Sequence, residues 1–151
     1  MAGVDDTIYK TKYYRDKIYD LLVADANLIA RNTKFAQKLP EFALNQFPIV
    51  LVNSQSDTLD RVTLGGTAGE DLRTFIVQVN YFTKSHVDDT AHDDIMDMGD
   101  EIIEAVKFMR DADYAMVPNV SHPIVDRAAA SPPFIYGGEI TIEIQNWYNR
   151  T

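Results

Sequence analysis

Apolar side chains near the start of the chain recur at the spacing of one helix face. They are Tyr14, Ile18, Leu21 and Leu22. This pattern predicts a helix from about Thr7 to Ala24, with Asp5 and Asp6 suited to cap its first turn. A less regular segment, Asn27 to Leu39, follows and stops at Pro40.

A longer amphipathic helix is predicted in the second half of the chain. Its apolar residues step by three and four positions along one face: Ile95, Met98, Ile102, Ala105 and Met109. Thr90, with Asp93 three residues later, resembles a capping box at the helix start. Gly99 destabilises a helix by about 1 kcal/mol relative to alanine. We therefore expect another element to approach the helix closely at Gly99.

Two strands are predicted between these helices. Phe47 to Val52 is a continuous apolar run, typical of a strand buried on both faces, and it ends at Asn53-Ser54. Leu72 to Lys84 alternates apolar and polar residues, although Ile76 and Phe82 interrupt the polar positions. This alternation predicts a strand with one buried face and a partly covered second face.

The polar segment between these two strands, residues 55–70, is predicted to form an arm. It contains glycines and no periodic apolar pattern. A gap of that length in a compact domain is usually functional or disordered, so the segment is either a long hairpin arm or a mobile loop. We expect it to be mobile in an isolated subunit, with Leu59, Val62 and Leu64 finding partners on a neighbouring subunit.

The last third of the chain is expected to add two strands. One lies within Val117 to Ala129, the other runs from Glu139 to Tyr148, and a flexible connection at 128–133 separates them. The predicted fold class is α+β, a mainly antiparallel sheet of about four to five strands with two helices packed on one face. Residues 1–151 are expected to form a single domain. The predicted sheet core consists of Ile49, Leu51, Phe75, Val77, Val79, Ile140, Ile142 and Ile144.

The composition is that of a soluble globular protein, with 46% hydrophobic and 25% charged residues. Its formal charge of −9 argues against a dedicated binder of nucleic acid or of anionic membranes. Because the chain has no cysteine, disulfide scaffolds, thiolate zinc sites and thiol catalysis are excluded. Neither a signal peptide nor a membrane span is predicted, since no suitable apolar run is found.

The charges are concentrated in two regions of opposite sign. Basic residues dominate from Lys10 to Lys38 and acidic residues from Asp88 to Asp113. Such runs are usually solvated helix faces, and the alternative is that they form complementary patches between subunits. On that alternative, the candidate subunit-interface residues are Lys12, Arg15, Asp97 and Asp100, together with Leu59, Val62 and Leu64 of the arm.

Candidate catalytic and metal-binding groups are few. His86 to Asp94 combines imidazole and carboxylate groups that suit zinc, iron or manganese, but its two histidines do not share a helix face. Gly65 to Gly69 lacks the GK[ST] and the following helix of a phosphate-binding loop. No serine lies in a nucleophile elbow. We expect no catalytic residue, no metal site, no cofactor and no enzyme activity.

Three local patterns, in this order along the chain, point to a known family. The first is the amphipathic helix Tyr14–Leu22 followed by the strand Phe47–Val52. The second is the polar arm that leads into Leu72–Val79, then an acidic linker and the helix Ile95–Met109. The third is the closing strand Ile140–Ile144. In these patterns the chain resembles the tail terminator (tail-completion or neck) proteins of long-tailed bacteriophages.

The resemblance implies a virion structural protein. Such a protein forms a ring, commonly hexameric, on the end of the tail tube, stops tube growth and provides the surface that joins tail to head. The implied partners are further copies of the chain, the major tail tube protein, head-completion or connector proteins, and genomic DNA that passes through the channel without specific binding. The implied location is the neck of the virion tail, after assembly in the host cytoplasm. Another neck or tail-tube component, or a small non-phage α+β binding domain, remains the alternative.

Overall fold

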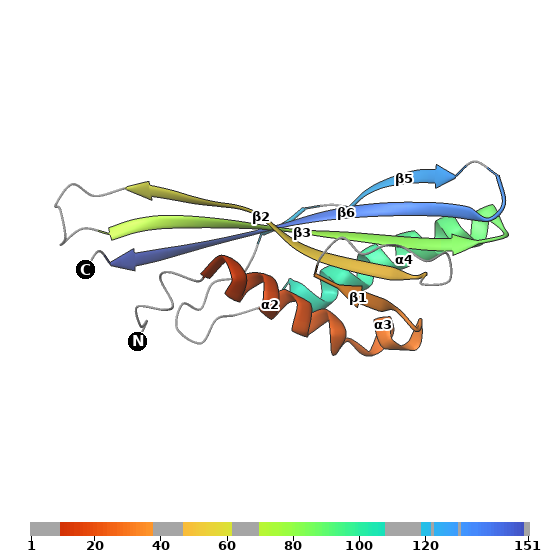
Figure 1. The fold of residues 1–151 in the computed structure, drawn as a ribbon, viewed down its shortest axis with the longest axis horizontal. Helices are drawn as coiled ribbons and strands as arrows, with labels where there is room; N and C mark the ends of the chain where they lie inside the picture. Colours follow the sequence, from red (N-terminus) through yellow and green to blue (C-terminus); the bar gives the residue numbers. More distant parts are fainter. Residues whose placement is uncertain are drawn as a thin grey trace.

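The computed structural model describes residues 10–37, 47–61, 70–107, 119–121, 123–129 and 131–149. Within them a six-stranded sheet carries the helices on one face (Figure 1). The helices are α2 (Lys10–Val23), α3 (Ala26–Ala30) and α4 (Asp88–Val106). The strands are β1 (Lys34–Ala36), β2 (Ile49–Arg61), β3 (Glu70–Ser85), β4 (Asn119–Val120), β5 (Ile124–Ala129) and β6 (Phe134–Asn149).

Three long antiparallel strands form the body of the sheet. β3 pairs with β2 on one side and with β6 on the other, and the pairing with β6 runs from Glu70 opposite Asn149 to Ser85 opposite Phe134. β1 adds to β2 as a short parallel strand, while β4 and β5 both pair with β6. The predicted α+β class with a mainly antiparallel sheet is confirmed. The described sheet has six strands, more than the four to five expected.

The main core lies between this sheet and the helices. Every second residue of β3 from Phe75 to Tyr81 is buried, and these residues lie opposite β6 positions 138–144. α4 contacts β3 and β6, and α2 contacts β2 and β3. The prediction that two helices pack on one face is therefore confirmed (Figure 1). The helix residues in this core are Tyr14, Ile18, Leu22, Leu28, Ala91, Ile95, Met98, Ile102 and Val106.

The apolar start of β2 is buried on both faces, as predicted. Val50 and Val52 belong to the core under the helices. Ile49 and Leu51 are also buried, at 2% and 6% exposure, but lie on the opposite face because side chains alternate along a strand. All eight predicted core residues of the sheet are buried, and these two line its other face.

The segment predicted as one stretch from Asn27 to Leu39 divides into α3 and β1. α3 begins after Asp25, whose carboxylate accepts the backbone N–H of Leu28 at 3.1 Å. It ends at Ala30, and Asn32, which follows the C-cap Arg31, has a φ of 57°, a left-handed conformation that asparagine tolerates better than most residues. The Lys34 N–H then donates to the Pro48 carbonyl at 2.9 Å, so the chain continues as a strand beside β2.

The start of α4 differs from the predicted capping box. The helix begins at Asp88, after Val87 as N-cap, and no side chain caps it. Asp88 and Asp89 occupy the first turn, where carboxylates interact favourably with the helix dipole. The capping role predicted for Thr90 is therefore wrong.

Several strands differ in extent from those that the sequence predicted. β2 does not end at Asn53-Ser54, because it pairs with β3 as far as Arg61. β6 begins at Phe134 instead of Glu139, and the range Val117 to Ala129, predicted to hold one strand, contains both β4 and β5. The predicted cap at Asp5 and Asp6, and Met109 of the second helix, lie outside the described residues.

Candidate assembly surface

β2, β3 and β6 continue past the N-terminal end of α2 as a three-stranded arm (Figure 1). This three-stranded arm consists of Thr58–Arg61, Glu70–Thr74 and Gln145–Asn149, which are paired in register. It therefore includes part of β6 as well as the described ends of the arm predicted at residues 55–70. Within the described part of the predicted arm, residues 56–61 pair antiparallel with residues 71–76 of β3, as the strands of a hairpin do. The expected mobility of the arm stays a prediction.

One of the three interface residues predicted on the arm lies within the described residues. Leu59 lies on β2 at the register position opposite Arg73. Val62 and Leu64 lie outside the described residues. The contact predicted for Leu59 with a neighbouring subunit stays a prediction.

The basic and acidic regions meet within a single subunit, at Arg31. Its guanidinium donates to both carboxylate oxygens of Glu101, at 2.8 Å from Nε and 2.9 Å from Nη2. Asp94 and Asp97 lie at 3.6 and 3.9 Å from the same guanidinium. The hydrogen bond to Glu101 is the main reason that the pKa of Arg31 is raised. This ion pair fastens the end of α3 to α4, and sequence reasoning missed it.

The other predicted charged residues are divided between paired and exposed positions. Arg15 pairs with Asp16 at 3.0 Å, and Asp16 also accepts a hydrogen bond from Gln37 at 2.8 Å. Lys12 on α2 and Asp100 on α4 are exposed. Of the predicted interface charges, Lys12, Asp97 and Asp100 are exposed, and Asp97 also lies 3.9 Å from Arg31 in the same subunit.

Asp88 joins the start of α4 to the sheet. Its carboxylate accepts a hydrogen bond from Tyr136 Oη at 2.7 Å and lies 3.5 Å from Nη1 of Arg127. The hydrogen bond to Asp88 raises the pKa of Tyr136. His92, one turn further along α4, contacts the Tyr136 ring edge-on at 5.3 Å. This cluster joins β5 and β6 to the first turn of α4. Asp88, at the acidic start of the helix, therefore has a structural role.

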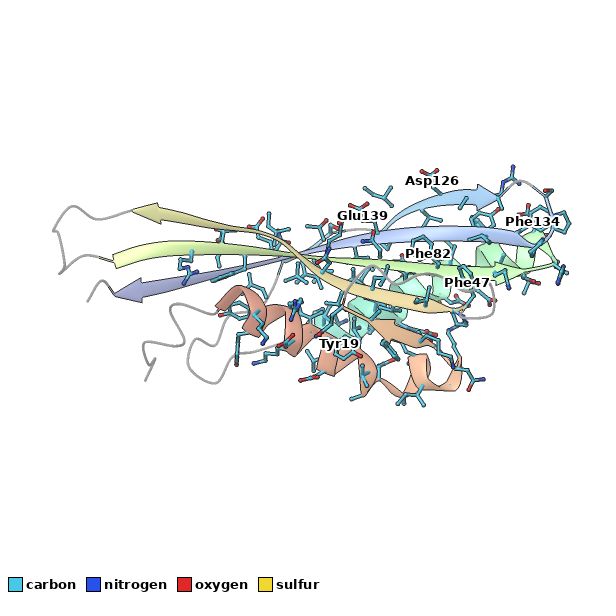
Figure 2. The ribbon with its side chains drawn as sticks, in the orientation of Figure 1. Tyr19, Phe47, Phe82, Asp126, Phe134 and Glu139 are labelled. Atoms are coloured by element: carbon cyan, nitrogen blue, oxygen red, sulfur yellow. The ribbon has the colours of Figure 1, made fainter. Side chains whose placement is uncertain are left out.

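The sheet face away from the helices carries a shallow groove of about 240 Å³ between β3, β5 and β6. Phe82 lies across Gly137, where a Cβ atom would come within 2.9 Å of the ring. Figure 2 shows Asp126 and Glu139 on this helix-free side. Ile124, also in the groove lining, is 68% exposed. An apolar floor with carboxylates at its border suits contact with another protein better than a buried small molecule.

A second, open groove of about 470 Å³ follows the outer side of α2, lined by Tyr13, Lys17 and Leu21 among others. In the described part of the chain, no group of three or more His, Cys, Asp or Glu side chains is placed to hold a metal ion. Nor does the described part contain a helix long and apolar enough to cross a membrane.

No family model and no curated protein matches the chain by sequence. The fold has a solved counterpart. It is a chain in a structure described as the virion of a native gene transfer agent (GTA) particle, with a TM-score of 0.54 and 14% sequence identity. The match covers 89% of this chain and 94% of that chain. At this identity the likeness shows a shared fold over nearly the full length of both chains.

Proposed function

We propose that the chain is a structural protein of a phage-like virion, and that it acts there as a tail terminator. The observation that carries the proposal is the end-to-end match in fold to a chain of a gene transfer agent virion. The match covers most of both chains, 89% of this one and 94% of the other.

In this role the chain forms a ring on the end of the tail tube, ends tube growth and offers a joining surface to the head. The order of helices and strands that resembles tail terminators supports this finer assignment. The features of the described surface also support it. The arm, the apolar groove with carboxylates at its border and the exposed acidic side of α4 are all suited to protein contacts.

The proposed partners are further copies of the chain, the tail tube protein and the head-completion or connector proteins. The ring number is proposed as six, and the location as the virion neck. DNA would pass through the ring without specific binding, since net charge of −9 disfavours contact with phosphate. The role proposed is structural and not enzymatic.

Deletion of the gene in the strain that produces the particles tests the proposal. We expect separate heads and unjoined tail tubes of irregular length in electron micrographs. A complete absence of tubes would identify a tube subunit instead. Normal, joined particles would contradict a virion assembly role and favour an unrelated binding domain.

Complementation gives the matched control. The intact gene restores joined particles of uniform tail length, and antibodies against the chain then label the junction between head and tail. Labelling along the whole tube would contradict the terminator assignment.

A further inference from the structure

The two outer strands of the arm each present an edge that no described strand covers. β1 pairs with β2 only at Ile49–Leu51, so β2 from Val52 to Arg61 has no described partner on that side. β4 pairs with β6 at Ile142 and Glu143, so β6 from Ile144 to Asn149 likewise has no described strand on its outer side, and we refer to these two edges as open. Both open edges lie beside β3, on opposite sides of the same arm.

An open strand edge exposes a row of backbone N–H and C=O groups that can pair with another strand. Proteins usually protect such edges with charges, proline or bulges. The open part of β6 has the sequence Ile-Gln-Asn-Trp-Tyr-Asn, with no charge and no proline. Its length is six residues, roughly 20 Å at about 3.3 Å per residue. An uncharged edge of this kind is suited to pairing.

The β2 edge is different in character. Its open part contains Asp57, Asp60 and, at its end, Arg61, besides a bulge between Ser54 and Ser56. Two β2 edges that meet with Asp57 opposite Asp60 would bring like charges directly across a strand pair, which is destabilising. The uncharged β6 edge imposes no such repulsion on β2. The charge distribution therefore favours pairing of β6 with β2 over pairing of β2 with itself.

We propose that, in the assembly, the open β6 edge of one subunit pairs with the open β2 edge of the next subunit. This inference rests on the proposed function, because it takes a second copy of the chain as the occupant of each edge. Contact between two different edges is head-to-tail, and such contacts form closed rings when the rotation closes. The pairing of β6 with β6 would give a two-fold dimer and leave β2 open.

The strand directions predict the type of pairing. β2 and β6 both run antiparallel to β3 and hence run in the same direction. If all subunits of a ring present the same sheet face inward, β6 of one copy and β2 of the next are parallel. The three-stranded arms would then join into one continuous sheet around the ring.

Disulfide crosslinking tests this pairing, and the chain has no cysteine to interfere. Thr58, Thr74 and Gln145 occupy one row across the arm. Gln145→Cys is combined in one chain with Ser56→Cys, Thr58→Cys or Asp60→Cys, which allows for a shift of two residues in register. Particles that carry each variant are oxidised and examined on non-reducing gels with an antibody against the chain.

We expect at least one combination to give a ladder of multimers whose largest member contains as many copies as the ring. Most copies of the chain should be crosslinked. Each single variant should stay monomeric. Pairing Gln145→Cys with Asp57→Cys or Leu59→Cys should crosslink at least tenfold less, because adjacent strand positions face opposite sides.

Three outcomes overturn the inference while leaving the proposed function intact. They are dimers from Gln145→Cys alone, a crosslink to a protein of different mass, and no crosslink at any β2 position in particles that contain the chain. Absence of the chain from purified particles contradicts the proposed function instead. Thermal melting of each purified variant, expected within a few degrees of the parent, shows that the subunit remains folded.

Discussion

The hydroxyl oxygen of Tyr81 lies 2.6 Å from the position that a Cβ atom on Gly99 would occupy. Gly138 of β6 lies against the same side chain, since a Cβ there would overlap the phenol ring. Tyr81 is fully buried. α4 and β6 can approach its ring closely because Gly99 and Gly138 have no side chains. The close approach predicted at Gly99 is therefore confirmed.

Gly99→Ala is expected to destabilise the subunit, although alanine favours a helix by about 1 kcal/mol over glycine. The added methyl group would meet Tyr81, whose ring cannot shift because Gly138 and the core enclose it. Overpacking of this kind typically costs about 1–3 kcal/mol. Urea denaturation of the two proteins measures the difference.

Removal of the Tyr81 hydroxyl oxygen, which the added Cβ atom would meet, provides the control. In a Tyr81→Phe background the same Gly99→Ala change should destabilise less, with Pro123 as the remaining near neighbour, its Cγ at 3.1 Å from the added Cβ. An equal loss in both backgrounds would show that the hydroxyl of Tyr81 is not the cause.

The stability of the subunit is expected to fall between about pH 10 and pH 12 because of Tyr81. Burial raises the pKa of Tyr81 to about 12, with a smaller contribution from the charge of Asp100. The ordinary pKa of tyrosine is about 10, so over this range the unfolded chain loses its proton before the folded one. The folded state is therefore progressively disfavoured, by about 2 kcal/mol in all.

Tyr81→Phe isolates this effect. The variant lacks the titrating group, so its free energy of unfolding should decline less steeply between pH 10 and pH 12. At neutral pH it should be at least as stable as the parent, because Tyr81 Oη is buried with no hydrogen-bond partner among the described residues. Parallel pH profiles for the two proteins would contradict the prediction.

Arg31→Ala should destabilise the subunit by about 1.5–3 kcal/mol, the usual range for a hydrogen bond to a charged group. The Arg31 and Glu101 side chains are only 25% and 19% exposed, so water replaces their contact poorly. Arg31→Lys should recover only part of the loss, because an ammonium group cannot bind both carboxylate oxygens in the same planar geometry.

Lys107→Ala is the matched control for Arg31. Lys107 pairs with Glu104 on the same helix, and Glu104 is 67% exposed. Exposed pairs of this kind contribute about 0–1 kcal/mol. Chemical denaturation should therefore separate the two variants, and an equal effect would argue that the Arg31 pair has no special structural role.

The sequence predicted best those elements that are long enough for their buried residues to recur at the spacing of a strand or a helix. β3 and β6 alternate because one face of each is buried under the helices, and Ile95, Met98 and Ile102 form a stripe because α4 buries one side. β1 has only three residues, too few for a period, and pairing with β2 stabilises it. The polar continuation of β2 to Arg61 has no apolar alternation, and its strand conformation depends on pairing with β3.

The candidate surface was harder to predict because its contacts join distant parts of the chain. Arg31 and Glu101 are 70 residues apart, and no local pattern links them. Opposite net charge in the two regions suggested an attraction between neighbouring subunits, which stays a prediction. The structure shows that part of this attraction lies within one subunit, which the regional charges alone could not distinguish from contact between subunits.

Contact between the two charged regions of neighbouring subunits remains a prediction, and Lys12 and Asp100 test it most directly. Both are exposed, whereas Asp97 lies 3.9 Å from Arg31, so that reversing Asp97 would also disturb the subunit itself. We expect Lys12→Glu to weaken assembly at low salt and Asp100→Lys in the same chain to restore it in part. Sedimentation velocity of the assembled rings measures both effects.

Salt dependence distinguishes charge pairing from an indirect effect of the substitutions. Exposed ion pairs contribute about 0–1 kcal/mol each, so they influence register and association rate more than affinity. Because the Debye length shrinks to about 3 Å at 1 M salt, the difference between Lys12→Glu and the parent should nearly vanish there. If Lys12→Glu assembles as well as the parent at low salt, the two charged regions do not pair across subunits and their exposed charges serve solubility.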